Sequence, residues 1–463
     1  MNLREQAEKL IEQDNYPEAA RLLSKHLDAN LEDPKTLFLL GYCFMKTEGA
    51  GLAMQCFFRA ASIFPGEAAV WHNIGKLYHD LNDDEKADEY FRKALKCQPS
   101  FYNSLEGLGM THLNRGEFER AIHYCNQALA EEPTTVEART NRGMAYLALR
   151  RWREGWPDYN ANVGHDKNRV VLKYGDEPEW DGSKGKNIVV FGEQGIGDEI
   201  SFASCIPDLI RDSKSVTIDC DGRLENLFNR SFGVDTHGTR YKKDAEWRKD
   251  SKFDAHIAMG QLAQFYRNSD ASFPGTAYLK PNPEMALQWR ALLDSLGPKP
   301  KIGLSWTGGL LHTGLKKRSV TLDTFAPLFK EVDANWISLQ YKEPDVAEAE
   351  DKYGVKIHDW EWGTRVRDYD QTAALVSELD LVISVTTAVV DLCAGLGTEC
   401  FCLVPSQPLW RHLQKGETFP WGSSVKLFRQ KGREWPVYNL LGELRDRFGN
   451  GCIKGAQASK EAA

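Results

Sequence analysis

Two patterns of hydrophobic and polar positions follow one another along this chain. Up to about residue 163 the pattern is helical and repeats about every 34 residues. Beyond it, short apolar runs that predict strands alternate with helix-like segments at 202–211, 283–295, 324–329, 372–379 and 388–396. The runs are NIVVFG, SVTIDC, KIGLSW, NWISLQ, DLVISV and ECFCLVP. Because apolar strands that alternate with helices are typical of parallel sheets, we expect an α superhelix followed by an α/β region.

The repeat is marked by glycines that are followed by the same residue types at fixed offsets. The glycines are Gly41, Gly75, Gly109 and Gly143, and the residues downstream of the first three are Ala53, Ala87 and Ala121, then Phe57, Phe91 and Cys125, then Ala60, Ala94 and Ala128, then Pro65, Pro99 and Pro133. This pattern is that of tetratricopeptide (TPR) repeats. Small residues suit the close crossing of two helices, the larger side chains fill the space beside them, and proline ends the second helix. We expect about five helical hairpins over residues 2–163.

A stack of such hairpins leaves a concave groove, which most often binds a peptide or protein. The alternative is that the repeats only brace the region that follows. Asn73 and Asn141 occupy equivalent positions, two residues before the repeat glycine, but Leu39 and Gly107 stand there in two other repeats. The asparagine ladder of grooves that resemble those of O-GlcNAc transferase is therefore incomplete.

Composition and proline-rich stretches indicate the domain boundaries and exclude several classes of partner and location. The Pro-rich SLGPKPK stretch precedes a fresh strand, so we predict a TPR domain at 1–165, two α/β halves at 166–297 and 298–450, and a tail at 451–463. The net charge of −8 argues against a general affinity for nucleic acid. With no long apolar run and no recognisable signal peptide, we expect no transmembrane segment and a cytoplasmic location. The ten cysteines lack a paired CxxC spacing, so neither disulfides nor a zinc site is expected.

The stretch FGEQGIGDEISFASCIP places Gly195, Gly197 and Asp198 directly after a predicted strand. In α/β sheets ligands bind at the carboxyl ends of strands, where glycines permit close backbone approach and the next helix offers free amides. The sequence therefore predicts a ligand-binding loop here. The alternative is that Asp198 simply caps the helix that follows.

Several motifs, in this order, resemble those of a known family. They are EPEWDGSKGKNIVVFGEQGIGDEISFASCIPDL, KIGLSWTGGLLHTGLKKRSVTLDTFAPL, WISLQYKE, YDQTAALVSELDLVISVTTAVVDLCAGLG and WGSSVKLFRQ. The chain is similar to bacterial TPR proteins whose C-terminal region resembles the heptosyltransferase (ADP-heptose:lipopolysaccharide) group of glycosyltransferases. The resemblance implies the GT-B fold, with two Rossmann-like halves, the donor nucleotide mainly on the C-terminal half and the acceptor facing the N-terminal one.

The resemblance also assigns roles to residues. Asp198 matches the general base, with Glu193 as the substitute; the alternative for Glu193 is an exposed loop acid. Lys316, Lys317 and Arg318 match phosphate-binding residues, or else form a solvated charge run. Thr386 and Thr387 follow a strand and are expected to cradle a diphosphate, although Thr387 also suits a helix cap.

The sequence departs from the family at two positions, since the usual pattern has Asp where this chain has Thr386 and His where it has Asp391. In similar enzymes these two residues help to hold the donor, so Asp391 is a candidate donor-binding residue that would contact a sugar or ribose hydroxyl. Two functions stay open. One is a metal-independent, inverting glycosyltransferase that needs no cofactor, takes a nucleotide sugar as substrate and recognises a protein or glycan acceptor through the TPR groove. The other is a TPR scaffold for protein interaction whose glycosyltransferase-like domain is inactive.

Overall fold

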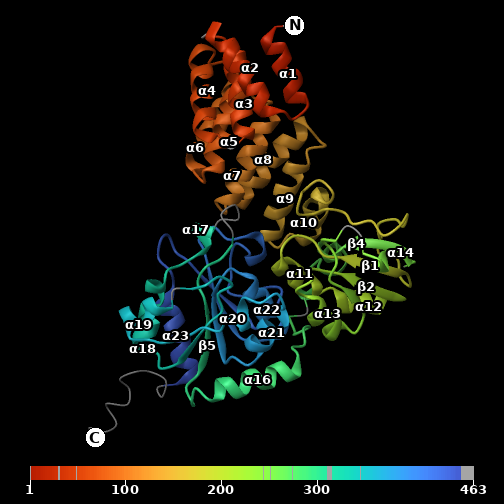
Figure 1. Cartoon of the computed structure of the whole chain (residues 1–463), viewed down its shortest axis with the longest axis vertical. Helices are drawn as coiled ribbons and strands as arrows, with labels where there is room; N and C mark the ends of the chain where they lie inside the picture. The colour runs from red at the N-terminus through yellow and green to blue at the C-terminus, as the bar shows by residue number, and fades with distance from the viewer. Residues whose placement is uncertain are drawn as a thin grey trace. The chain divides into compact units, whose positions relative to one another are not determined.

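The computed structural model describes residues 2–29, 32–47, 49–242, 245–250, 252–273, 275–309, 315–344 and 346–449. They divide into two compact units, Met1–Tyr146 and Leu147–Ala463. Each unit has its own architecture, helical in the first and α/β in the second (Figure 1). The predicted domain limits at 165, 297 and 450 stay predictions.

The first unit consists of helices that pack in consecutive pairs. They are α1 (Leu3–Glu12), α2 (Tyr16–Ala29), α3 (Pro34–Lys46), α4 (Ala50–Ile63), α5 (Ala68–Asp80), α6 (Asp84–Cys97), α7 (Tyr102–Asn114), α8 (Phe118–Glu131) and the greater part of α9 (Val136–Ala148). This arrangement confirms the predicted helical superhelix.

The repeat glycines lie where two helices of a pair cross. A Cβ at Gly41 would stand 2.8 Å from the Phe57 ring, and one at Gly75 would stand 2.8 Å from the Phe91 ring. Only glycine therefore permits the approach, as the sequence predicts. Phe91 also explains why glycine replaces asparagine at position 107 of the ladder, because a Cβ at Gly107 would lie 2.7 Å from the same ring.

The second unit contains two parallel sheets, which confirms the predicted α/β region. A four-stranded sheet has the order β3-β2-β1-β4 and a six-stranded sheet the order β10-β9-β8-β5-β6-β7. The strands are β1 (Asn187–Phe191), β2 (Ser215–Asp219), β3 (Asp235–His237), β4 (Ala255–Ala258), β5 (Lys301–Ser305), β6 (Asn335–Ser338), β7 (Ile357–His358), β8 (Leu381–Val385), β9 (Cys400–Val404) and β10 (Val425–Arg429).

Helices flank both sheets, and α11, α12 and α13 lie beside the four-stranded sheet in Figure 1. The α-helices of this unit are α10 (Trp152–Tyr159), α11 (Ile196–Ala203), α12 (Ile206–Asp212), α13 (Glu225–Phe232), α14 (Trp247–Asp250), α15 (Ala263–Tyr266), α16 (Pro283–Asp294), α17 (Leu315–Arg318), α18 (Ala326–Glu331), α19 (Ala347–Tyr353), α20 (Glu361–Thr364), α21 (Tyr369–Ser377), α22 (Ala388–Leu396) and α23 (Val437–Phe448). Helix α16 lies in sequence between the two sheets.

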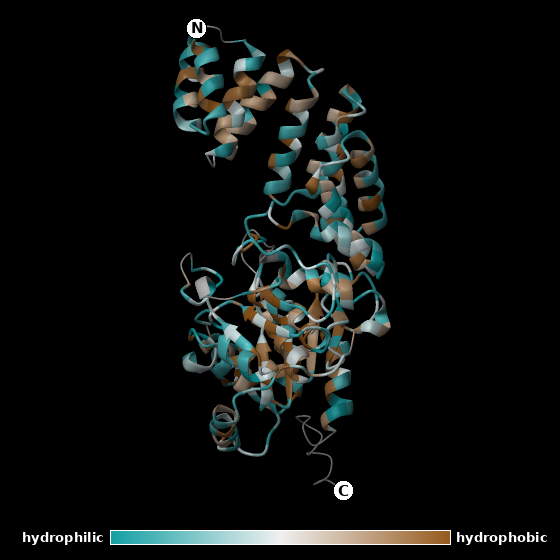
Figure 2. Ribbon diagram, turned by 90° about the vertical axis from the view of Figure 1, so that its right-hand side faces the viewer, coloured by the Kyte–Doolittle hydropathy of each residue, from teal (hydrophilic) through white to brown (hydrophobic). Residues whose placement is uncertain are grey.

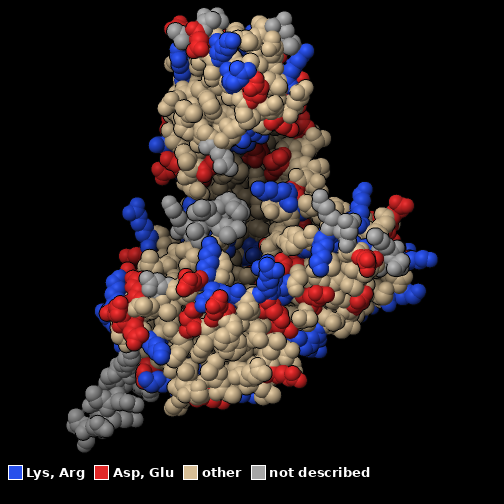
Figure 3. Space-filling view, viewed as in Figure 1, with Lys and Arg blue, Asp and Glu red and all other residues tan. Residues whose placement is uncertain are grey.

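Hydrophobic residues concentrate along the strands of the second unit (Figure 2), where β8 and β9 are buried along their whole length. The core of the six-stranded half combines strand residues with α18 and α23, as in Ile383, Phe329 and Leu440. Acidic and basic side chains are interspersed on the face seen in Figure 3. Among the helices in the described ranges, none has both the length and the apolar character needed to cross a bilayer.

Candidate functional site

The six-stranded sheet has its switch in strand order between β5 and β8. These two strands are neighbours, yet the chain continues from β5 to β6 on one side and from β8 to β9 on the other. Ligands of open α/β sheets bind at such a point, outside the carboxyl ends of the strands. The loops that follow β5 and β8 touch at Gly308, where a Cβ would lie 3.1 Å from the Arg318 carbonyl oxygen and 3.2 Å from Thr387 Cγ2.

Arg318 lies at the end of α17 and reaches the end of β8. Its Nε donates a hydrogen bond to Thr386 Oγ1 at 3.1 Å, and its Nη2 donates to the Thr386 carbonyl oxygen. Burial lowers the pKa of the Arg318 guanidinium, and the charge of Arg411 lowers it further. The structure thus brings together two residues that the sequence singled out separately for phosphate binding.

The other predicted phosphate ligands are placed differently. Thr387 is the N-cap of α22, and its Oγ1 accepts a hydrogen bond from the Val389 amide at 3.3 Å. Its role in binding a diphosphate stays a prediction. Lys317 lines a cavity beside Pro405 and Gln430, at the ends of β9 and β10. The side chain of Lys316 lies outside the described residues, although its backbone belongs to α17.

The loop after β1 begins α11 with a capping arrangement. Gly195 is the N-cap, and Asp198 Oδ2 accepts a hydrogen bond from the Gly195 amide at 3.1 Å. Asp198 therefore has a structural role at the helix start, at position N3 rather than at the N-cap. Its other oxygen, Oδ1, lies 3.1 Å from Arg411 Nη1, with a quarter of the side chain exposed.

Gly197 serves helix packing. A Cβ there would lie 2.6 Å from Asp391 Oδ2 and 3.2 Å from Ala388 Cα, so glycine is what lets α11 pack directly on α22. The sequence suggested that these glycines admit a ligand. In the structure, α22 occupies the space that the missing side chain of Gly197 leaves.

Asp391 is buried in this helix contact and faces α11. Its Oδ1 accepts from Ser201 Oγ at 2.6 Å and lies 3.6 Å from Arg411 Nη1. Burial raises the pKa of Asp391 to about 6, because the charged form loses its hydration and the Arg411 charge compensates only in part. Asp198, Asp391, Arg411 and Ser201 thus form one polar cluster between the two halves.

Arg411 is the central cation of this cluster, and sequence reasoning missed it. It belongs to a short 3₁₀ helix, Trp410–His412, that follows β9. Burial opposes its charge, but Asp198 and Asp391 raise the pKa of the guanidinium. The available signal was an arginine that directly follows the apolar residues Pro, Leu and Trp in the segment PLWRHL.

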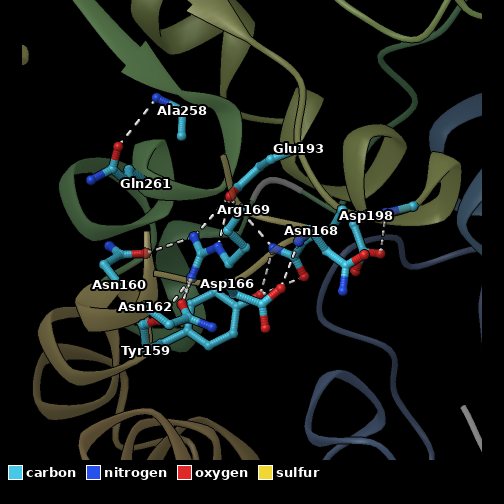
Figure 4. Close-up of polar contacts among 12 residues, drawn as sticks. Tyr159, Asn160, Asn162, Asp166, Asn168, Arg169, Glu193, Asp198, Ala258 and Gln261 are labelled. Carbon is cyan, nitrogen blue, oxygen red and sulfur yellow. Dashed lines mark hydrogen bonds and ion pairs between the residues drawn. The ribbon is translucent and has the colours of Figure 1, made fainter. Parts of the chain in front are cut away.

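The four-stranded sheet has its own switch point, between β1 and β4, and a side chain of the chain itself fills it. Arg169 donates to Glu193 twice, from Nε to Oε2 at 2.6 Å and from Nη2 to Oε1 at 2.7 Å (Figure 4). A Cβ at Gly260, which follows β4, would lie 2.2 Å from Glu193 Oε1. The crevice at this switch point is therefore occupied.

The geometry corrects the expectation for Glu193. Its side chain is 1% exposed and both oxygens bind Arg169, so Glu193 is not an exposed loop acid. Its role as a substitute base stays a prediction, which the buried ion pair disfavours.

Comparison with protein families supports the repeat assignment. Tetratricopeptide repeat profiles match residues 68–101 and 107–155. The chain contains TPR repeats. These TPR repeats are a protein-interaction module and account for the glycine and alanine spacing described above.

Individual relatives extend the comparison. The chain is 27% identical to protein FlbA of Caulobacter vibrioides over 435 residues, which is 89% of this chain and 73% of FlbA. It is 29% identical to the peroxisomal targeting signal receptor of Kluyveromyces lactis over 98 residues, 21% of this chain and 17% of that receptor. Among solved structures, a crystal structure of MamA covers 34% of this chain and 91% of its own, with 18% identity and a TM-score of 0.31. The similarity to FlbA extends through most of the α/β unit.

Proposed function

We propose that the α/β unit is a GT-B glycosyltransferase that transfers a sugar from a nucleotide-sugar donor, and that the TPR repeats recognise the acceptor. The observation that carries the proposal is the polar cluster between the two sheets. It places a carboxylate from the first half, Asp198, within 3.1 Å of a guanidinium from the second half, Arg411. Arg318 stands nearby at the switch point of the six-stranded sheet.

This pairing meets the needs of glycosyl transfer. The oxygen of an acceptor hydroxyl attacks the anomeric carbon of the donor, the bond from that carbon to the nucleotide oxygen breaks, and the nucleotide leaves with the electron pair. Asp198 takes the proton of the attacking hydroxyl. Arg318 and Arg411 stabilise the negative charge that develops on the departing diphosphate. Attack from the face opposite the leaving group inverts the anomeric centre, and the two cations fill the role that a metal ion has in other transferases.

A specific observation favours the second candidate function, an inactive scaffold. Both oxygens of Asp198 are engaged, one by the Gly195 amide and the other by Arg411, and α11 packs directly on α22. A donor would have to draw Arg411 away from Asp198. The diphosphate of the donor would replace Asp198 as the partner of Arg411, because a diphosphate offers the guanidinium a stronger anion than one carboxylate.

Calorimetry with nucleoside diphosphates and their sugars, followed by turnover assays, separates the two functions. The Asp198→Asn variant should still bind the donor but turn over about 100-fold more slowly or worse, as expected for loss of a general base. The control is Asp235→Asn, which removes an exposed acid from the same half. Unchanged turnover in Asp198→Asn removes this residue from the mechanism. If no nucleotide sugar binds the wild-type chain at millimolar concentration, the scaffold function holds instead.

A further inference from the structure

A cavity of about 380 Å³ lies at the carboxyl ends of β9 and β10. This volume is within the range of roughly 300–1,000 Å³ that is usual for small-molecule sites. The cavity adjoins the switch point, since Ser319 in its lining accepts a hydrogen bond from the Gly308 amide at 3.0 Å. It extends from there to β9 and β10, which lie one and two strands beyond β8, or about 5 and 10 Å at the usual strand spacing. Lys317 and Arg318 are adjacent in sequence, yet only Lys317 lines this cavity.

The lining of the cavity favours an anion. Lys317 and Arg433 supply positive charge, and no acidic residue is among the described residues that line it. Within the described ranges, no hydrogen bond or ion pair engages the Arg433 guanidinium, which is exposed at a turn between Lys431 and Glu434. A cation in such a position gains most from a ligand that can accept two parallel hydrogen bonds, as a phosphate does.

The remaining walls suit a ring that carries this anion. Trp435 lines the cavity while it packs against the core of the half, which fixes the position of the indole. Gln430 holds two walls together, since its Oε1 accepts from the Ser406 amide at 3.1 Å and its Nε2 donates to the Arg433 carbonyl oxygen at 3.4 Å. Ser319 and Gln407 add hydrogen-bonding groups.

A second cavity, of about 410 Å³, has a different character. Arg230 lines it together with Asp368 and Asp370, and Asp370 already binds the Arg230 guanidinium through both oxygens. The positive charge of that cavity is therefore neutralised. Only the first of these two cavities presents a cation whose hydrogen bonds are not used within the described structure.

We propose that the cavity lined by Lys317, Arg433 and Trp435 is a second ligand site, which binds a phosphate monoester carried by a ring-bearing small molecule. The phosphate lies between Lys317 and Arg433, and the ring lies against Trp435. A nucleoside monophosphate and a sugar phosphate share this chemistry. The site goes beyond the proposed function, because it does not depend on Asp198 or on the charge cluster.

Calorimetry on the full chain tests the proposal with inorganic phosphate, AMP and glucose 1-phosphate as probes. One or both ring-bearing probes should bind at least tenfold more tightly than inorganic phosphate, because the ring adds contact with the indole. Arg433→Gln should lower that affinity about tenfold, since it removes a charge-assisted contact with the phosphate. The matched control is Lys431→Gln, which removes a charge from the same turn without lining the cavity. Preference for AMP or for glucose 1-phosphate then identifies the source.

Further variants decide where the probe binds. Trp435→Leu should abolish the preference for a ring over inorganic phosphate, and thermal unfolding shows whether that variant is folded. Arg433 is exposed, so its substitution should leave stability nearly unchanged. If Arg318→Gln but not Arg433→Gln weakens binding, the ligand lies at the switch point and the proposal is overturned. It is equally overturned if Arg433→Gln behaves like Lys431→Gln, or if none of the three probes binds at millimolar concentration.

Discussion

Replacement of Arg169 by methionine should destabilise the α/β unit more than the loss of an ordinary salt bridge. Arg169 is buried, and its guanidinium binds both oxygens of Glu193. It also donates to the Tyr159 carbonyl oxygen at 2.7 Å, to Asn162 Oδ1 at 2.7 Å and to Asn160 Oδ1 at 3.2 Å. One side chain therefore ties the segment after α10 to the loop after β1 (Figure 4).

The expected magnitude follows from what the substitution leaves behind. Methionine fills most of the volume, but Glu193 stays 1% exposed without its partner. Removal of one partner from a buried ion pair costs about 3–5 kcal/mol, because the remaining charge is neither hydrated nor paired. The double variant Arg169→Met with Glu193→Met should recover much of this loss, since two apolar side chains of similar volume leave no buried charge. Arg290→Met is the control: Arg290 is 58% exposed in its pair with Glu378, and surface pairs contribute about 0–1 kcal/mol.

Urea unfolding followed by tryptophan fluorescence measures these differences. Of the 13 tryptophans, Trp71 alone lies in the first unit, so the signal reports on the α/β unit. A loss below about 1 kcal/mol for Arg169→Met, equal to that of Arg290→Met, would refute the reasoning that this pair fills the switch point of the first sheet. A double variant as unstable as the single one would show that the burial of the Glu193 charge is not the cause.

Two further predictions concern the contact between α11 and α22. Gly197→Ala should destabilise the unit by about 1–3 kcal/mol in urea unfolding, because its Cβ would lie 3.2 Å from Ala388 Cα, which cannot move away freely. The control is Gly442→Ala, in open space on α23, which should instead stabilise the unit by about 0.5–1 kcal/mol. Equal effects of the two substitutions would contradict the packing argument. The pKa of Asp391 is raised from 3.8 to about 6 in the folded protein. Between about pH 4 and 6 the folded state therefore keeps a proton that the unfolded state has released. The stability that this proton contributes is lost as the pH rises from about 4 to 6. Asp391→Asn should remove that slope, at most about 1.4 kcal/mol per pH unit, and parallel stability curves for the two proteins between pH 4 and 7 would contradict it.

The sequence predicted the elements whose pattern is local. The TPR hairpins follow from glycine, alanine and proline at fixed spacing, and the six predicted apolar runs correspond to β1, β2, β5, β6, β8 and β9. The strands that it missed, β3, β4, β7 and β10, are mostly short or partly polar and gain their order from pairing with a neighbour. The helix predicted at 202–211 is two helices in the structure. Helix α11 begins earlier, after its Gly195 N-cap, and ends at Ala203, and α12 begins at Ile206 with Pro207 in its first turn.

The candidate site was less predictable, because its contacts join residues far apart in the chain. Arg318 and Thr386 were both candidates, but they are 68 residues apart, and no sequence pattern predicts the hydrogen bond between them. Ser201 and Asp391 are 190 residues apart. Arg169 and Arg411 carried no motif at all, although each arginine is the centre of a buried network.

The two sheets differ in what occupies their switch points, and this difference bears on where a ligand enters. In the first sheet, the guanidinium of Arg169 already fills the crevice between the loops after β1 and β4. In the second sheet, the equivalent crevice holds Arg318, whose guanidinium donates to the Thr386 hydroxyl and carbonyl oxygens. An incoming anion competes more easily with a neutral acceptor than with a buried carboxylate, because less Coulombic attraction is lost. Under the proposed function, the second sheet would hold the phosphate-bearing donor, and the first sheet would contribute Asp198 across the helix contact.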